Sequence, residues 1–472
     1  MRPHLPRAAF AGTLALSGSV LSTAAFAGAE EPAQGTADFT PAVAVEGFYR
    51  TNLYLQEGEA GGGTATVSGG GVQIRPTLDL KTRSRQVWFD VGLGYTAQVM
   101  VPKAYESETD GGIRFDADGN VVPDVSNLNR FNFVDGAAKL VALPSSVVGV
   151  KLSDRASLSG RETEAVSATD AFLMMFRNEA RGSLTIRPGS SLELDLGAAS
   201  DIQQFTLPEC NKDAGCANIE NSASLNSRLG YAAVADLQWK FFPKTALVSG
   251  FEYGRFDWSD NFVNTQGDGL NPDQLGNYLG VPDGSWWHVD GGLRGRFTEK
   301  LVLGTVLGYT SMTYDEATVT ADGSNESDAL PVDLSPAQAG FDADLTGLTA
   351  SVELGYEVSE NQRLVLSYGR DYQDVFFTNY VGFNRVTGTL QGTAWKRMDY
   401  EIGAMYRREA YVGEVSRDDH FLRASGSAAY AALDWMDVTG GVVWTRRASV
   451  GGTNPAIEFD DTRLSLGLAF HY

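Results

Sequence analysis

Charged side chains recur at every second position in several stretches of this sequence. Arg177, Glu179 and Arg181 follow this spacing in one stretch, and Glu193 and Asp195 in the next. Because alternate residues of a strand point to one face, such stretches would gather guanidinium and carboxylate groups on a shared surface. That surface can hold water and attract ions of both signs. The candidate positions are Arg177, Glu179, Arg181, Glu193, Asp195, Glu252, Arg294, Arg296, Glu353, Arg370, Arg407, Arg423, Arg446 and Arg463.

Residues for covalent catalysis are sparse. The chain has four histidines, and two of them, His288 and His420, stand near acidic residues. A hydrolase needs a nucleophile and a base placed together, and neither a G-x-S-x-G nor an H-E-x-x-H motif occurs. We therefore predict that the chain is not an enzyme, carries no cofactor and binds no catalytic metal. The two histidines are interpreted as loop or strand-end residues.

The N-terminus has the pattern of a secretory signal peptide. Arg2 and Arg7 precede a run of small and apolar residues that ends in Ala25-Phe26-Ala27. This order of basic, apolar and small residues predicts cleavage after residue 27, followed by a short periplasmic lead-in over 28–41. An uncleaved anchor helix is the alternative. Net charge is −22, which argues against a nucleic-acid partner because phosphate binding needs a basic face.

Beyond residue 42 the hydrophobic period is two. Val87, Phe89, Val91 and Leu93 alternate with polar or small residues, and the same alternation recurs along the chain. Eight short turns are expected at 81–85, 143–146, 187–191, 241–245, 297–300, 358–362, 395–399 and 434–437. Nine longer loops are expected near 56–69, 102–126, 158–170, 203–223, 258–284, 316–340, 372–380, 412–418 and 450–455.

These connections predict an all-β fold, a closed antiparallel transmembrane β-barrel over 42–472 with about 18 strands, or 16 to 18 allowing for uncertain ends. Short turns on one side and long loops on the other are typical of bacterial outer-membrane barrels. A soluble propeller or solenoid would show a repeated period, which this sequence lacks. The final strand, with Leu464, Leu466, Leu468 and Phe470 leading to Tyr472, resembles the C-terminal signature of such barrels, although that signature usually ends in Phe.

Three segments carry a further likeness. GGLRGRFTEKLVLGTVLGY (291–309), ALVSGFEYGRFDW (246–258) and EIGAMYRREAY (401–411) resemble a family of outer-membrane β-barrel porins associated with exopolysaccharide operons. The resemblance extends over most of 42–472 in the general pattern of residues and does not rest on one diagnostic motif. It implies a channel that passes a secreted polysaccharide and works with a periplasmic export protein. Outer-membrane lipid and lipopolysaccharide would be its surroundings.

Three functions remain open from the sequence. The first is a channel for exopolysaccharide export, the expectation that the resemblance favours, and it predicts aromatic platforms inside the barrel. The second is a general diffusion porin for small hydrophilic solutes, with the charged positions lining the pore. The third is a structural or adhesive barrel, or a barrel enzyme, with a lumen filled by side chains. The charged face favours the two channel functions.

The two cysteines predict a small disulfide. Cys210 and Cys216 lie in CNKDAGC, and the bacterial envelope is oxidising. A metal or redox site is the minor alternative, because no His or third Cys is near. Asp116, Asp118 and Asn120 faintly resemble a calcium loop but fit a polar hairpin tip better, because Gly119 is at the fourth position instead of the sixth and no Glu stands at the twelfth.

Replacing Cys210 by Ser tests the disulfide. Closing so short a loop stabilises it by roughly 2 kcal/mol, so the variant should be cut faster by protease within this loop. Limited proteolysis with peptide mapping measures the rate. Two titratable thiols in the native protein, with unchanged digestion, would contradict the pairing.

Overall fold

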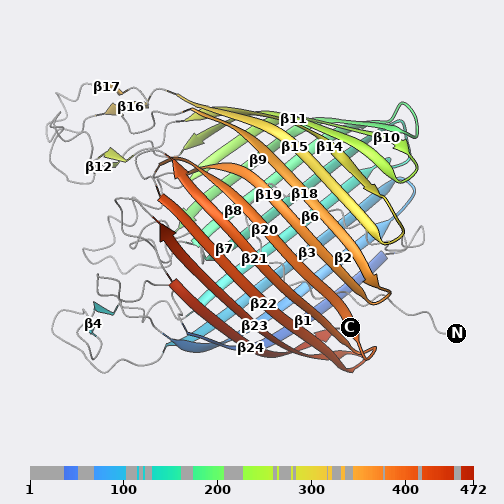
Figure 1. The fold of residues 1–472 in the computed structure, drawn as a ribbon, viewed down its shortest axis with the longest axis vertical. Coiled ribbons are helices and arrows are strands. Elements are labelled where there is room, and N and C mark those ends of the chain that lie inside the picture. The colour runs from blue at the N-terminus through green and yellow to red at the C-terminus, as the bar shows by residue number, and fades with distance from the viewer. Residues whose placement is uncertain are drawn as a thin grey trace.

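The chain forms one closed sheet of eighteen antiparallel strands. In the computed structural model the described residues are 37–51, 68–102, 114–115, 121–122, 130–160, 174–206, 227–258, 263–264, 278–279, 283–315, 317–320, 331–334, 344–375, 378–412, 417–450 and 459–471. Among these residues no helix is long and apolar enough to cross a membrane. Figure 1 shows the strands running obliquely around a hollow cylinder.

Long strands of similar length build the wall, and each pairs with its neighbours in the chain. In order they are β1 (Ala37–Arg50), β2 (Gly69–Arg83), β3 (Val87–Pro102), β6 (Arg130–Ala142), β7 (Val148–Gly160), β8 (Met174–Ile186), β9 (Leu192–Thr206), β10 (Arg228–Phe242), β11 (Thr245–Trp258), β14 (Gly284–Arg296), β15 (Leu301–Tyr314), β18 (Leu345–Ser359), β19 (Gln362–Val375), β20 (Thr378–Ala394), β21 (Met398–Val412), β22 (Arg417–Leu433), β23 (Met436–Val450) and β24 (Phe459–His471).

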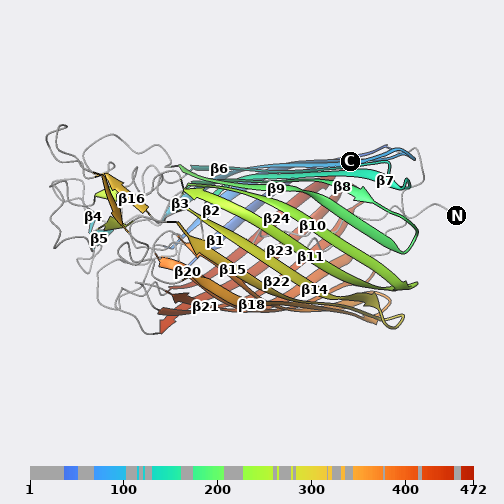
Figure 2. The same cartoon turned by 90° about the horizontal axis from the view of Figure 1, so that it is seen from above.

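Three small two-stranded sheets stand apart from the wall. β4 (Arg114–Phe115) pairs with β5 (Val121–Val122), β12 (Val263–Asn264) with β13 (Tyr278–Leu279), and β16 (Ala317–Thr320) with β17 (Pro331–Leu334). Figures 1 and 2 place them at one end of the cylinder, opposite the short turns. We call this end the loop end and the other the turn end.

The barrel closes where the first strand meets the last. β1 pairs with β24 from Ala42 opposite His471 to Arg50 opposite Arg463. Closure removes the free edges of an open sheet, so backbone groups along the seam are satisfied within the wall. The predicted all-β closed barrel of about 18 strands is confirmed, and the eight predicted short turns connect strands at the turn end.

Two boundaries differ from the sequence prediction. A loop was expected at 372–380, but β19 and β20 stay paired through much of this segment, from Tyr372 opposite Gly382 to Val375 opposite Thr378. Polar and aromatic residues mix there and obscure the alternation. The lead-in was expected to reach residue 41, whereas β1 begins at Ala37. Pro41 and short polar residues hide the period of two. The signal peptide lies outside the described residues.

The two faces of the wall differ sharply. One face carries apolar side chains that are strongly exposed, such as Leu307 at 69% and Leu466 at 68%. On the other face, Arg181 of β8 contacts Asp236 of β10, across the intervening β9. Strands two apart in a sheet stand roughly 10 Å apart, and their side chains converge only on the concave side of a barrel. The charged face is therefore the inside, and the apolar face is the outside.

Glycines on the inner face allow the wall to curve. A Cβ on Gly292 of β14 would lie 1.9 Å from the backbone oxygen of Thr305 on β15. A Cβ on Gly304, on the neighbouring strand, would meet nothing within 4 Å. A side chain at Gly292 would thus push two paired strands apart, whereas one at Gly304 has room.

Gly292 and Gly304 allow a matched test of how closely β14 and β15 approach each other. Gly292→Ala should lower the free energy of unfolding by about 1–3 kcal/mol, the usual cost of overpacking. Gly304→Ala should leave it nearly unchanged. Urea unfolding of the barrel in detergent, followed by tryptophan fluorescence, measures both. Equal stabilities for the two variants would contradict the close approach of β14 and β15.

Candidate channel lining

Strand register places most of the predicted charged positions inside the barrel. Those on the inner face are Arg177, Glu179, Arg181, Glu193, Asp195, Glu252, Arg294, Arg296, Glu353, Arg407, Arg423 and Arg463. Their position on this face follows from the register. Their role in permeation stays a prediction.

Arg370 and Arg446 lie on the outer face instead, which corrects the prediction for both. Arg370 stands opposite Ala350, which in turn stands opposite the exposed Leu307. Arg446 stands opposite the exposed Leu422. Both are near the loop end, where in a membrane an outward charge would lie at headgroup level, so the cost expected for a lipid-facing charge at mid-membrane would not apply.

Seven consecutive strands each contribute an inward arginine. Going around the wall from β20 through the β24–β1 seam to β2, these are Arg385, Arg407, Arg423, Arg447, Arg463, Arg50 and Arg75. We call this set the arginine arc. It follows one side of the lumen over more than a third of the eighteen strands.

The sequence prediction missed four members of the arc: Arg50, Arg75, Arg385 and Arg447. The signal was available for one of them. Val438, Val442 and Trp444 occupy the outer positions of β23, so the alternation points Arg447 inward and Arg446 outward. For the others no neighbouring charge repeats at the same spacing, and only the register reveals the shared face.

At its loop end the arc is deeply buried in ion pairs. Arg447, 2% exposed, lies 2.5 Å from the carboxylate of the fully buried Asp419 and 3.4 Å from Glu409. Its guanidinium also donates to the phenol of Tyr411 at 3.3 Å. Since an uncompensated charge there would cost several kcal/mol, the acids stabilise the buried arginine in this position.

Neighbouring arginines of the arc are held by acids and aromatic rings. Arg407 pairs with Glu409 at 2.5 Å and lies 5.1 Å from the ring centre of Phe421. Arg50 donates to Asp461 from two nitrogens, at 3.0 and 2.9 Å. Such paired, stacked guanidiniums have little rotational freedom, so the arc presents a fixed array of charge.

Nearer the turn end the arc is more open to the lumen. Arg463 donates to Glu46 at 2.9 Å and to Gln73 at 3.2 Å, and its guanidinium lies 4.8 Å from the ring centre of Phe48. Arg75 pairs with the exposed Asp135 at 3.3 Å. These contacts span adjacent or next-adjacent strands and leave part of each group accessible to water.

The opposite wall carries acids. β10 stands nine strands from β23 around the barrel, so the two walls face each other across the lumen. Inward acids on β9, β10, β11 and β14 are Glu193, Asp195, Asp201, Asp236, Glu252 and Asp290. Several bind cations from nearby strands: Lys151 contacts Glu193 and Asp195, and Arg177 and Arg228 contact Asp201.

Both histidine candidates make local contacts. His288 faces inward, with Nε2 3.3 Å from the Asp290 carboxylate. His420 lies on the outer face, where its Nδ1 is 2.8 Å from the phenol oxygen of Tyr406. No group of three or more potential metal ligands occurs within the described ranges. The Cys210–Cys216 loop and the 116–120 hairpin tip lie outside those ranges.

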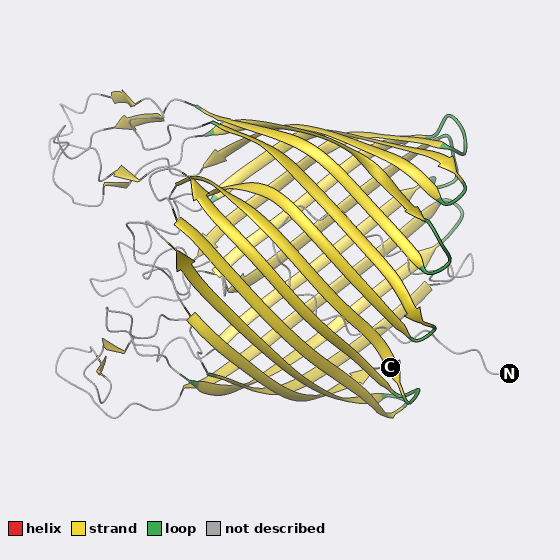
Figure 3. Cartoon of the chain, viewed as in Figure 1, coloured by secondary structure: helices red, strands yellow, loops and turns green. Residues whose placement is uncertain are grey.

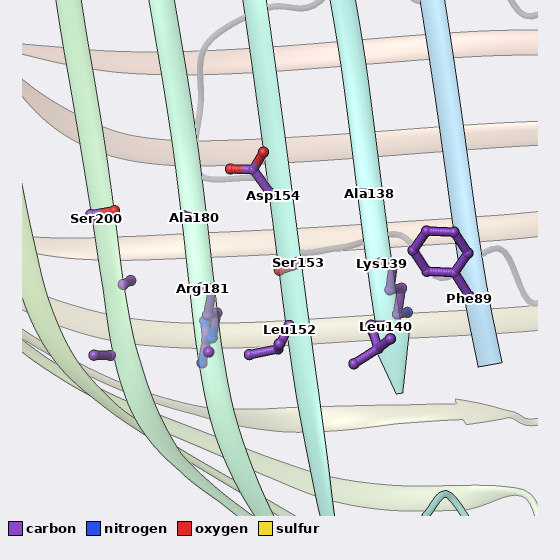
Figure 4. A pocket seen from close by; sticks show the side chains of 13 residues that line it. Phe89, Ala138, Lys139, Leu140, Leu152, Ser153, Asp154, Ala180, Arg181 and Ser200 are labelled. Carbon is purple, nitrogen blue, oxygen red and sulfur yellow. The ribbon is translucent and has the colours of Figure 1, made fainter. Parts of the chain in front are cut away.

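A hollow of about 420 Å³ lies on the wall formed by β3 and β6 to β9, and Figure 4 shows the side chains around it. Leu152, Ala180 and Gly182 share the outer face with Asp154, which accepts a hydrogen bond from Asn178 at 2.8 Å. Small residues create the depression. Because it opens outward, it is separate from the charged lumen.

Comparisons with known proteins give a weak likeness. No family model and no curated protein matches the chain. Among solved structures, OpdK of Pseudomonas aeruginosa with vanillate is 12% identical, with 92% of this chain and 99% of that one covered and a TM-score of 0.42. OccK2 of the same organism, with glucuronate, is 10% identical, with 93% of this chain and 99% of that one covered in the alignment and a TM-score of 0.43.

A mutant ferric enterobactin receptor, PfeA of P. aeruginosa, is 11% identical, with 93% of this chain and 81% of that one covered and a TM-score of 0.45. These proteins are bacterial outer-membrane barrels. At such identities and scores the likeness carries no argument about what passes through this lumen, and the residues of the wall must supply it.

We expect the barrel to lose much of its stability when one acidic partner of the buried Arg447 is removed. Asp419→Asn leaves Arg447 charged and short of a carboxylate, so the free energy of unfolding should fall by about 3–5 kcal/mol. Urea unfolding in detergent measures it. The control is Asp418→Asn, which breaks an exposed outer pair with Arg408 and should change little. Equal effects at the two adjacent positions would contradict the inward burial of Asp419.

Proposed function

We propose that this chain is an outer-membrane channel through which small hydrophilic solutes diffuse, with a preference for anions. The arginine arc is the observation that carries the proposal. Barrels of sixteen to eighteen strands are wide enough for an aqueous lumen, and a charged inner face keeps it wet. The exposed apolar outer face suits a lipid surrounding and would be costly in water.

The preference for anions follows from the balance of charge along the arc. The seven arginines of the arc face four inward acids on the same half of their own strands, namely Glu409, Asp419, Asp461 and Glu46. A fifth acid, Asp135 on β6, pairs with Arg75, so positive charge remains in excess along the arc. A wall with excess positive charge and low-dielectric backing raises the local concentration of anions. The acids of the opposite wall are themselves partly neutralised by Lys151, Arg177 and Arg228.

Export of an exopolysaccharide is less well supported. That function predicted aromatic platforms open to the lumen. Two inward rings near the loop end, Phe256 and Phe421, are instead almost fully buried. Phe256 packs against Trp286 and Tyr314 with ring centres 6.0 Å away in each case. A diffusion channel for small solutes needs no such platform and fits the charged lining better.

The outward charges near the loop end suggest how the barrel meets the outer leaflet. Arg408 pairs with Asp418 at 2.7 Å, and Arg255 with Asp315 at 2.7 Å. Exposed groups of both signs at this level suit the phosphates and bridging cations of lipopolysaccharide headgroups, which we include in the proposal as surroundings of the barrel.

Ion selectivity in a planar bilayer tests the proposal. The refolded mature protein should give stable conductance steps and a reversal potential, in a salt gradient, that favours chloride over potassium. The double variant Arg423→Gln/Arg463→Gln should shift the permeability ratio toward unity. The effect should weaken at high salt, because the screening length falls from about 10 Å at 0.1 M to about 3 Å at 1 M.

Arg446→Gln is the matched control, since Arg446 lies on β23 but faces outward. It removes one positive charge, against two in the double variant, and should leave selectivity unchanged. Absence of conductance from a correctly folded barrel would reject the diffusion channel. An equal shift from the outer and the inner variants would reject the role of the arc.

A further inference from the structure

The wall of the barrel divides between β18 and β19. Their pairing runs from the turn end up to Ala350 opposite Arg370 and stops there. Both strands continue: 345–349 remain paired with β15, and 371–375 remain paired with β20. Continued register would have joined these two segments residue for residue. We call the interval between them the fork, and Figure 3 shows the two strands spreading apart toward the loop end.

The side chain of Tyr372 lies in the fork. The ring of Tyr372 lies against Gly347, where a Cβ would be 2.4 Å from the ring carbons. Tyr372 is held by its neighbours: its phenol oxygen accepts a hydrogen bond from Arg370 at 2.9 Å, and its ring meets that of Tyr380 edge to face. Only a glycine at 347 leaves room for the ring in this position.

The depth of the fork places it at the outer surface of the proposed membrane. Its apex, Ala350, is ten residues from the turn that follows β18. At a rise of about 3.3 Å and a tilt near 40°, that distance is roughly 25 Å, the height of the apolar band of such barrels. The unpaired backbone therefore lies at headgroup level, where water can satisfy its polar groups.

The two sides of the fork differ in chemistry. Outside, exposed apolar residues such as Leu348 and Leu366 flank it. Beside it on the outer wall is a hollow of about 270 Å³, lined by Arg370, Arg408, Tyr372 and Tyr380 among others. Inside, the arginine arc begins one strand away, with Arg385 opposite Gly369. A molecule crossing here would keep its apolar part in lipid while its polar part meets arginines on both faces.

We propose that the fork is a lateral opening that connects the lumen with the outer leaflet, that Tyr372 closes it, and that it admits amphiphiles with an acidic headgroup. This function goes beyond diffusion along the barrel axis. Displacing the Tyr372 ring opens the wall. Arg370 receives the acidic group, and the apolar tail stays in the lipid.

Fluorescence quenching from the lipid tests the opening. The full chain, with Cys210 and Cys216 replaced by Ser, carries a bimane label at Ser351→Cys, an inward position beside the fork apex. It is reconstituted in vesicles that contain doxyl-labelled phosphatidylcholine. Tyr372→Ala should raise quenching several-fold. Gly347→Ala should do the same, because the new methyl group displaces the ring.

Gly369→Ala is the control on the same strand as Tyr372, since a Cβ there meets nothing within 4 Å. It should leave quenching unchanged. The same low quenching in all variants, with the barrels folded, would overturn the lateral opening. Equal increases in all three would show a general loosening of the wall and would overturn the role of Tyr372.

A second arm tests the headgroup. In the Tyr372→Ala background, doxyl-stearate should quench more than its methyl ester, and adding Arg370→Gln should remove the difference. Equal quenching by acid and ester would overturn the acidic class. Conductance of the same samples separates the two proposals. Quenching without conductance would reject the diffusion channel and retain the lateral opening. Conductance without quenching would reject the lateral opening and retain the diffusion channel.

Discussion

Backbone pairing in a closed ring is the constraint on which this structure depends. Once β1 pairs with β24, each residue of the wall is assigned to the inside or the outside by the parity of its position. A shift of one residue in any strand would move its arginines into lipid and its leucines into the lumen. The apolar outer face and the charged inner face therefore enforce the register, and the register in turn builds the arginine arc from strands far apart in the chain.

Parity also explains how far the sequence could predict the site. Runs such as Val87 to Leu93 alternate cleanly, so the closed barrel and its short turns follow from the period of two and the turn residues. Near the loop end the outer face leaves the hydrocarbon and accepts charge. There Arg446 and Arg447 are adjacent arginines with opposite directions, and only the alternation of Val438, Val442 and Trp444 earlier in β23 indicates which one faces inward.

Features that depend on how strands pair were not predictable from the sequence. The arc requires Arg50 of β1 to stand opposite Arg463 of β24, and this pairing exists only because the ring closes. The pairing of Arg447 with Asp419 and Glu409 requires three strands in register. The fork is the absence of a pairing that the alternation would favour, since both strands keep their period through it.

The buried and the accessible parts of the arc serve different ends. A buried guanidinium such as Arg447 is enclosed by acids, contributes little net field, and gains its value from fixing β21, β22 and β23 relative to one another. Arg463 and Arg75 are only partly screened by their partners, so each contributes more to the field that a solute would meet than Arg447 does. The same residue type thus provides rigidity at the loop end and attraction lower in the lumen. The fork lies beside β20, so any acid that entered there would first meet Arg385, the first member of the arc.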